Sequence, residues 1–564
     1  MRTIHLLHRT LSAAAALCLC LAAAAQENIV RVADFGAVPN DGKNDLKQLR
    51  KAFRKAEKTG ATKIVFEAGT YDIFHTDIEE NDAMVLSNLA GVTMEGAVDG
   101  NGEPATTLLR HYEMAPDIKA RNMLRIYECE NFTLKNMKFD NSPRYMTSGE
   151  VVFNDGKHVV VRIFDGCTLA DGTLLYCANL WDLKTRNLKH TGSVTFGGSV
   201  SKKAAEYTTR LTDPEGRRVL ISSEDAASKI EVGDGISWHF GWNGTQVDFW
   251  KCDNMRMENV HSYSAIGFHF QSSLCRNISG YKVRIGREGD DLNCGSRDAW
   301  KMWLCMGTAT MDDIYMDGVR WDGQNVHGKF LYFVEAEGAS TATFSYNGMS
   351  VERIEPGDRI GMWKDRETEQ LMTVKKYEVL PIEWGKPRLV RVTFEEPLPD
   401  FLCTSTPCNP YSHTCRYTLE NSEFRNIAGC ASILRNDNSV LRNCTFSHIM
   451  YPAVFLGGDL NNESVTGRNL LVEDCVFEDC AWESRNGVKG AFAAAVLPFK
   501  DFPVPYIYDI RLEGNTFRDC GTAVSVKGVK GIVLKDNVFE NVEVPFRYAD
   551  CDGIESDVST EEQK

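Results

Sequence analysis

The segment Leu419-Glu420-Asn421-Ser422-Glu423-Phe424 repeats in kind along this chain. Each copy has an apolar residue, a polar turn and, five positions on, an aromatic residue. The clear copies start at Leu134, Leu441, Val472, Leu512 and Leu534, and Met316-Asp317-Gly318-Val319-Arg320-Trp321 is a weaker one. Copies 419 to 441 and 512 to 534 lie 22 residues apart, which is the length of one coil of a parallel β-helix. We therefore predict an all-β solenoid with the aromatic side chains stacked inside it.

A short amphipathic helix is expected ahead of the first coil. Asn44 or Asp45 can cap its first turn, and a strand, Ile64-Val65-Phe66, follows it directly. Its apolar residues recur at steps of three and four, as in Leu46, Leu49, Ala52, Phe53 and Ala56. The arrangement resembles the entry to secreted right-handed parallel β-helices such as the polygalacturonases, in which a helix caps the open end. We expect the same fold and the same cap here.

Two stretches, about 151–240 and 341–400, are rich in β pattern but lack the repeat. Each contains a similar phrase, Ile230-Glu-Val-Gly-Asp-Gly-Ile236 in the first and Ile354-Glu-Pro-Gly-Asp-Arg-Ile360 in the second. A Gly-Asp turn between apolar runs is a hairpin signal. We predict two inserted β-barrel modules, which divide the solenoid into residues 26–150, 241–340 and 401–564.

The composition and the N-terminus limit the class of protein. Of 564 residues, 43% are hydrophobic and 25% charged, and the net charge is -15, which makes nucleic acid an improbable partner. Arg2, Arg9 and the Ala/Leu/Cys run that ends at Ala25 predict a cleaved signal peptide over residues 1–25 and a secreted or periplasmic protein. The mature chain has no apolar run long enough for a membrane span. No zinc pattern occurs, so we expect neither a metal nor a cofactor.

The candidate chemistry lies between Cys252 and Glu337. Asp298 and Asp322 are 24 residues apart, so in one coil of solenoid they would occupy equivalent positions on neighbouring strands, about 4.8 Å apart. Their splayed carboxyl groups could then lie about 6.5–9.5 Å apart, the separation that suits inverting glycoside hydrolysis. Aspartates of this kind also simply cap solvent-facing turns, and the spacing alone does not separate the two interpretations.

The motifs around this pair carry a more specific resemblance. Arg297-Asp298-Ala299-Trp300, followed by Trp321-Asp322-Gly323-Gln324-Asn325-Val326-His327-Gly328, is similar to glycoside hydrolase family 110. That family comprises exported, inverting exo-α-1,3-galactosidases with a β-helix and inserted barrels. The resemblance implies that Asp298 and Asp322 are the catalytic acid and base, in an order that the sequence leaves open. It also implies that the partner is a glycan ending in α-galactose or a related sugar, contacted by Asn325.

The chain departs from the family pattern at two places. Trp321 stands where the family has the first acid of an Asp-Asp pair, and Ile427 and Gly429 stand where arginines are expected. Trp321 either fills the core, at the aromatic position of the weak repeat, or offers a face to a sugar. His327 is either a structural histidine or a partner for a sugar hydroxyl.

Two further functions remain open on the sequence alone. In a polygalacturonase-like hydrolase or a polysaccharide lyase, Asp290 and Asp291 would contact the substrate, supply the working acids or bind calcium, and Arg287 is the only nearby candidate for a lyase base. In a noncatalytic carbohydrate-binding β-helix, we would expect the acid at position 321 and the arginines to be absent, as they are here. The oligomeric state is undefined.

Overall fold

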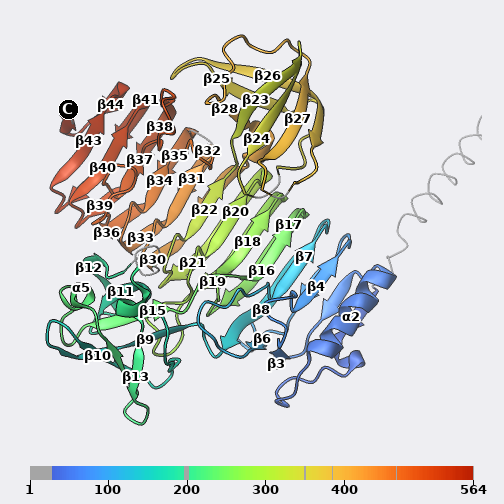
Figure 1. The fold of residues 1–564 in the computed structure, drawn as a ribbon, viewed down its shortest axis with the longest axis vertical. Coiled ribbons are helices and arrows are strands. Elements are labelled where there is room, and N and C mark those ends of the chain that lie inside the picture. Colours follow the sequence, from blue (N-terminus) through green and yellow to red (C-terminus); the bar gives the residue numbers. More distant parts are fainter. Residues whose placement is uncertain (1–27, 196–201, 349–350, 384, 465–466, 563–564) are drawn as a thin grey trace, which may run out of the picture.

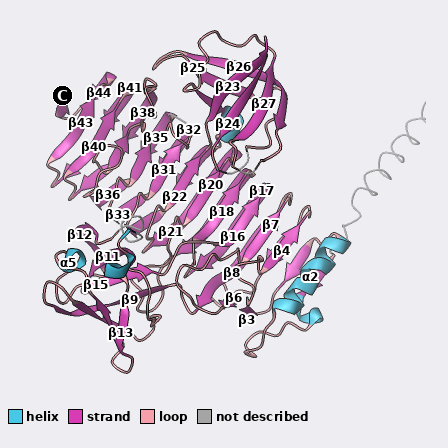
Figure 2. Cartoon of the chain, in the orientation of Figure 1, coloured by secondary structure: helices cyan, strands magenta, loops and turns pink. Residues whose placement is uncertain are grey.

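The structure is a computed structural model that describes residues 28–195, 202–348, 351–383, 385–464 and 467–562. The predicted signal peptide lies outside this part of the chain. Parallel strands wind into a long solenoid, so the prediction of a parallel β-helix is confirmed (Figure 1). Figure 2 shows how completely strands dominate, with one sizeable helix at the N-terminal end. None of the described helices has the length and apolarity needed to cross a membrane.

Two parallel sheets form the walls of the solenoid. The 12-stranded sheet contains β4 (Met84–Ser87), β7 (Leu124–Tyr127), β16 (Thr245–Trp250), β18 (Phe268–Ser273), β20 (Trp300–Trp303), β22 (Gln324–His327), β31 (Ser432–Arg435), β34 (Val454–Leu456), β37 (Phe492–Ala494), β40 (Thr522–Lys527), β43 (Val544–Ala549) and β45 (Thr560–Glu562). The 20-stranded sheet contains β1 (Ile29–Arg31), β2 (Lys63–Val65), β3 (Gly69–Phe74), β5 (Thr93–Glu95), β6 (Thr106–His111), β8 (Thr133–Ser142), β17 (Asp253–Ser262), β19 (Arg276–Ile285), β21 (Met306–Asp317), β29 (Arg416–Glu420), β30 (Glu423–Ile427), β32 (Asp437–Arg442), β33 (Thr445–Ile449), β35 (Arg468–Glu473), β36 (Val476–Cys480), β38 (Ile507–Glu513), β39 (Thr516–Arg518), β41 (Val529–Lys535), β42 (Val538–Glu540) and β44 (Asp552–Ser556).

The repeat aromatics stack inside the C-terminal coils, as predicted. Phe424, Phe446, Phe477, Phe517 and Phe539 pair in register, with neighbouring ring centroids 5.6, 5.1, 4.8 and 5.4 Å apart. All but the last are fully buried. Each coil therefore adds one aromatic layer to a continuous core.

The weak repeat copy was placed five residues too late. Met311 pairs with Leu419, and Met316 pairs with Phe424, so the true copy runs from Met311 to Met316. A methionine fills the aromatic position there, since a flexible thioether can occupy the same core space. Trp321 therefore lies beyond the copy and is only half-buried, and the prediction that it fills the core is wrong.

The helix α2 (Leu46–Thr59) caps the N-terminal end of the solenoid (Figure 1). Its buried face is the predicted one. The Asn44 side chain accepts a hydrogen bond from the Leu46 N–H at 3.0 Å, whereas Asp45 accepts one from the Val38 N–H at 3.0 Å. Asn44 thus accepts a hydrogen bond from a free N–H of the first turn. Asp45 joins the helix to the loop that follows the 3-10 turn η1 (Val32–Phe35).

One predicted barrel is present and the other is not. The second insert is a closed barrel of β23 (Leu331–Gly338), β24 (Thr341–Tyr346), β25 (Arg359–Trp363), β26 (Glu369–Val379), β27 (Arg388–Phe394) and β28 (Pro407–Pro410), and the 3-10 turn η2 (Tyr411–His413) follows it. The first insert is an open antiparallel sheet of β9 (Met146–Asn154), β10 (Val159–Ile163), β11 (Tyr176–Asp182), β12 (Asn187–Ser193), β13 (Arg210–Asp213), β14 (Arg218–Ile221) and β15 (Gly235–His239), with short helices α4 (Ala204–Tyr207) and α5 (Glu224–Ala227).

The edge strand β12 of the first insert lies against the solenoid. The Asn426 side chain on the solenoid accepts a hydrogen bond from the Leu188 N–H at 3.2 Å, and His190 reaches Asp479 at 2.6 Å. A sheet whose edge is covered in this way needs no closure. In both inserts the first and last strands pair, Met146 with His239 and Leu331 with Cys408.

Candidate active site

Asp298 and Asp322 occupy equivalent positions on neighbouring coils, as the 24-residue spacing predicted. Trp300 on β20 pairs with Gln324 on β22, and each aspartate lies two residues before its strand's pairing residue. The Ala299 N–H donates to the Asp322 carbonyl at 2.9 Å. The side chains lie below the surface, with exposed fractions of 2% for Asp298 and 1% for Asp322.

Asp322 has one bonded and one unbonded carboxylate oxygen. Its Oδ1 accepts the Cys430 N–H at 2.8 Å and lies 3.3 Å from Nη1 of Arg485. Its Oδ2 is buried and has no hydrogen-bond partner among the residues that the structure describes. Burial raises the pKa of Asp322, Arg485 opposes that rise and the charge of Asp298 adds to it, so the net shift is upward. A raised pKa beside a free oxygen suits proton transfer.

Asp298 has polar neighbours from the next strands. Asn325 Nδ2 donates to Asp298 Oδ2 at 3.4 Å. Lys301 lies on the outer face of β20. Burial lowers the pKa of Lys301, whereas the negative charge of Asp298 acts to raise it. The Asn325 Oδ1 is buried and finds no partner within the described residues. The predicted contact residue Asn325 thus binds Asp298 through Nδ2, and its Oδ1 is an acceptor without a partner among the described residues.

His327 lies one row further along β22, beside a cluster of charges. Its Nδ1 donates to the Gly328 carbonyl at 2.8 Å, and its Nε2 lies 3.6 Å from Glu463. Burial lowers the pKa of His327 well below its usual range, so the ring is neutral near pH 7 and Nε2 is an acceptor. Glu463 forms an ion pair with Arg435 and lies 4.0 Å from Lys301.

Trp321 lies next to the pair with part of its ring exposed. The Arg320 guanidinium sits 5.4 Å from the ring centroid and donates to the Cys177 carbonyl of the inserted sheet at 2.5 Å. Arg320 thereby fixes the insert against the coil that carries Asp322. With core filling excluded, the sugar-facing interpretation of Trp321 remains.

Asp291 has a structural role, whereas Asp290 lies at the surface. Asp291 is buried, accepts from Arg144 at 2.5 Å and from the Cys167 thiol at 3.1 Å, and so holds the inserted sheet to the solenoid. Asp290 is exposed. Arg287 is taken up by a bidentate ion pair with Asp317, at 2.8–3.0 Å. Asp291 and Arg287 are therefore engaged in the fold, whereas the role predicted for Asp290 stays a prediction.

Sequence reasoning missed the cationic side of this site. Ile427 and Gly429 supply no positive charge, but Arg435, on β31, and Arg485, from the loop after β36, both act on the charge of Asp322. Arg485 is 163 residues from Asp322 along the chain, so no local pattern could reveal it. Lys301 and Arg435 lie at outward-facing positions of β20 and β31, where side chains alternate between the two faces.

Comparison with known proteins gives distant, nearly full-length relatives. The chain is 24% identical to α-1,3-galactosidase A of Bacteroides fragilis strain YCH46, over 92% of this chain and 88% of the relative. It is likewise 24% identical to α-1,3-galactosidase B of Phocaeicola vulgatus, over 94% of this chain and 91% of that relative. Residues 411–555 match the family model described as a right handed beta helix region. Among solved structures, the A-module of the mannuronan C-5 epimerase AlgE4 of Azotobacter vinelandii aligns over 94% of this chain and 99% of its own, at 11% identity and a TM-score of 0.39.

Proposed function

We propose that this distant homologue of the α-1,3-galactosidases is itself an exported glycoside hydrolase that removes terminal α-linked galactose with inversion. The observation that carries the proposal is the buried pair Asp298 and Asp322, on neighbouring coils, with Asp322 Oδ2 unbonded within the described residues. A sunken pair can address a chain end more readily than the middle of a polysaccharide. The distant relatives carry the matching activity in their names.

The chemistry needs one protonated and one ionised carboxyl group. One aspartate gives its proton to the glycosidic oxygen as the C1–O bond breaks. The other takes a proton from a water molecule whose oxygen bonds to C1 from the opposite face, so that α-galactoside yields β-galactose. The charge of Asp298 raises the pKa of Asp322, and such repulsion favours one proton on a pair of neighbouring carboxyl groups.

The cationic groups give this pair a defined electrostatic environment. Arg485 and Arg435 lie close enough to Asp322 to lower its pKa against the effect of burial, and Asn325 bonds to Asp298. The sugar becomes oxocarbenium-like and positive in the transition state, so the arginines act on the carboxyl group and favour the ionised form of Asp322. His327 Nε2 and Asn325 Oδ1 are acceptors free for sugar hydroxyls among the described residues.

The test uses Asp298→Asn, Asp322→Asn and Asp290→Asn on p-nitrophenyl α-galactoside and α-1,3-galactobiose. Loss of a general acid or base costs about 10²–10⁴-fold in rate, so we expect the first two variants to lose at least a hundredfold in kcat. Asp290→Asn is the matched control, because that carboxylate is exposed. NMR of the first product should show β-galactose. Near-full activity of either site variant, or an unsaturated product, would overturn the assignment.

A further inference from the structure

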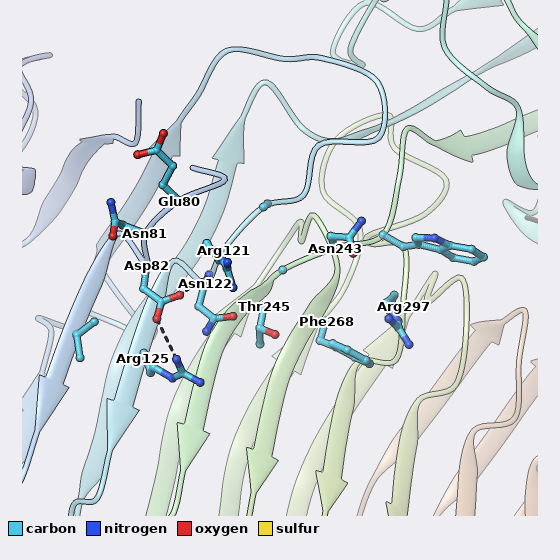
Figure 3. Close-up of a pocket in the computed structure, with 14 residues that line it drawn as sticks. Glu80, Asn81, Asp82, Arg121, Asn122, Arg125, Asn243, Thr245, Phe268 and Arg297 are labelled. Atoms are coloured by element: carbon cyan, nitrogen blue, oxygen red, sulfur yellow. Dashed lines mark hydrogen bonds and ion pairs between the residues drawn. The ribbon is translucent and has the colours of Figure 1, made fainter. Parts of the chain in front are cut away.

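The strand positions that hold the aspartate pair continue in register toward the N-terminal coils. Thr245 pairs with Phe268, and the registers of β18 with β20 and of β7 with β16 place Asp298 and Asn122 in the same ladder. The ladder therefore runs Asn122, Thr245, Phe268, Asp298, Asp322, one residue per coil. Figure 3 shows Asn122, Thr245 and Phe268 at the starts of successive strands, with Arg297 beside Phe268.

Asn122, Thr245 and Phe268 line a cavity of about 600 Å³, which ends at Arg297, the residue before Asp298. Besides the ladder residues, Arg297, Trp242 and Asn243 contribute to its wall. Strands are spaced by about 4.8 Å, so the position of Asn122 lies about 14 Å from that of Asp298. A cavity of this reach holds several sugar rings end to end, since one ring is about as long as one coil is high.

The other end of the ladder is closed. After Asp322 the equivalent position is taken by Cys430, which is buried. The row that holds Lys301 and Asn325 continues in Ile433 and Phe455. These two pack in a buried apolar cluster with Val488, from the loop after β36. A glycan whose terminal galactose lies at the aspartates can therefore extend only toward Phe268.

The wall chemistry is that of a neutral sugar site. The Trp242 ring is half-exposed and is held by Tyr176 at 5.7 Å and His239 at 6.0 Å, centroid to centroid, at the end of the inserted sheet. Aromatic faces stack on sugar rings, and amide and hydroxyl groups bond to sugar hydroxyls. The wall carries Glu80 and Asp82 against Arg121, Arg125 and Arg297. Arg125 pairs with Asp82 at 3.3 Å, so the wall keeps only a small positive excess.

We propose that this cavity binds the leaving part of the substrate, and that the natural substrate is a neutral oligosaccharide with three or more sugars behind the terminal galactose. The inference rests on the proposed function for the position of the scissile bond. Trp242, supplied by the first insert, is the specificity-determining residue. The insert thus contributes to the choice of substrate as well as to the wall of the site.

The kinetic test varies the leaving group at constant terminal galactose. The substrates are p-nitrophenyl α-galactoside, α-1,3-galactobiose, and α-1,3-galactosyl caps on lactose and on the tetrasaccharide di-N-acetyllactosamine. We expect kcat/KM to rise along this series. Trp242→Ala should lose about tenfold on the longest substrate, which is about 1.4 kcal/mol and within the range for aromatic contacts, and less than twofold on the nitrophenyl galactoside. Phe153→Ala, at an exposed aromatic outside the cavity, is the control.

A binding test separates this inference from the proposed function. Calorimetric titration with uncapped di-N-acetyllactosamine should give binding that Trp242→Ala weakens about tenfold and Phe153→Ala leaves unchanged. If no α-galactoside is cleaved but this binding holds, the cavity assignment stands and the proposed function fails. If cleavage is observed without any length dependence, or the tetrasaccharide does not bind, the cavity assignment is wrong and the hydrolase assignment stands.

Discussion

Removing the Arg485 charge should move the pH dependence of the reaction upward. Nη1 of Arg485 lies 3.3 Å from Asp322 Oδ1, and its charge lowers the pKa of that carboxyl group. At an effective dielectric constant near 20, a pair about 4 Å apart interacts by about 4 kcal/mol, or roughly three pKa units. Relaxation and the remaining Arg435 reduce this, so we expect Arg485→Gln to raise the pKa of Asp322 by about 1–3 units.

The assay is kcat/KM for p-nitrophenyl α-galactoside from pH 4 to 9, because this parameter reports the pKa values of the free enzyme. If Asp322 is the base, its ionisation sets the acidic limb, and that limb moves up. If Asp322 is the acid, the alkaline limb moves up. The limb that moves therefore settles which aspartate has which role.

Two variants control for other effects of the substitution. Arg485→Lys keeps a positive charge and should leave both limbs near their original positions. Arg511→Gln removes a surface arginine that pairs with Glu513 and should change nothing. Unchanged limbs in a folded Arg485→Gln protein would refute the electrostatic reasoning, and with it the place of Asp322 in the mechanism.

Three further changes test the fold and the site rim. Burial raises the pKa of Asp248 to about 7, so its native state loses stability as pH rises from about 4 to 7. Asp248→Asn should therefore stabilise the protein increasingly from pH 4 to pH 8, by up to roughly 4 kcal/mol, and urea unfolding that shows an equal effect at every pH would contradict this. Phe477→Ala removes the middle of the phenylalanine stack and should cost about 3–5 kcal/mol in unfolding free energy, whereas Val538→Ala, at an exposed position, should cost little. Trp321→Ala should raise KM for the nitrophenyl galactoside several-fold with Trp321→Phe close to wild type, and equal loss in both variants would argue against a stacking role.

The repeat made the solenoid predictable, because each copy places one apolar and one aromatic residue at fixed positions of a coil. The same rule failed at Met311–Met316, where methionine fills the aromatic position and the next aromatic residue, Trp321, gave a false register. The Gly-Asp phrases form turns that lead into β15 and β25, but neither turn closes a hairpin, because β15 pairs with β9 and β11 and β25 pairs with β26 and β28. They could not indicate closure, which depends on whether distant edge strands meet, as β23 and β28 do in the barrel.

The aspartate pair was accessible from sequence for a similar reason. A spacing of one coil fixes two residues on adjacent strands whatever surrounds them, and the pairing of β20 with β22 bears this out. The partners Arg485 and Glu463 come from loops of later coils, so their approach depends on the stacking of the whole solenoid. The prediction that Asp290 and Asp291 contact substrate was drawn from their acidity alone, and Arg144 and Cys167 account for Asp291 instead.

The paired ends of the two inserts have a consequence for how the chain folds. Strand β8 must find β17, and β21 must find β29, each across about a hundred residues. Closing such a loop costs roughly 2–3 kcal/mol more than closing one of a few residues. Once Met146 lies against His239 and Leu331 against Cys408, each long loop has become a short one. We therefore expect the inserts to form before the coils on either side of them join, so that β22, the strand after Asp322, gains its neighbour β31 only after the second insert has formed.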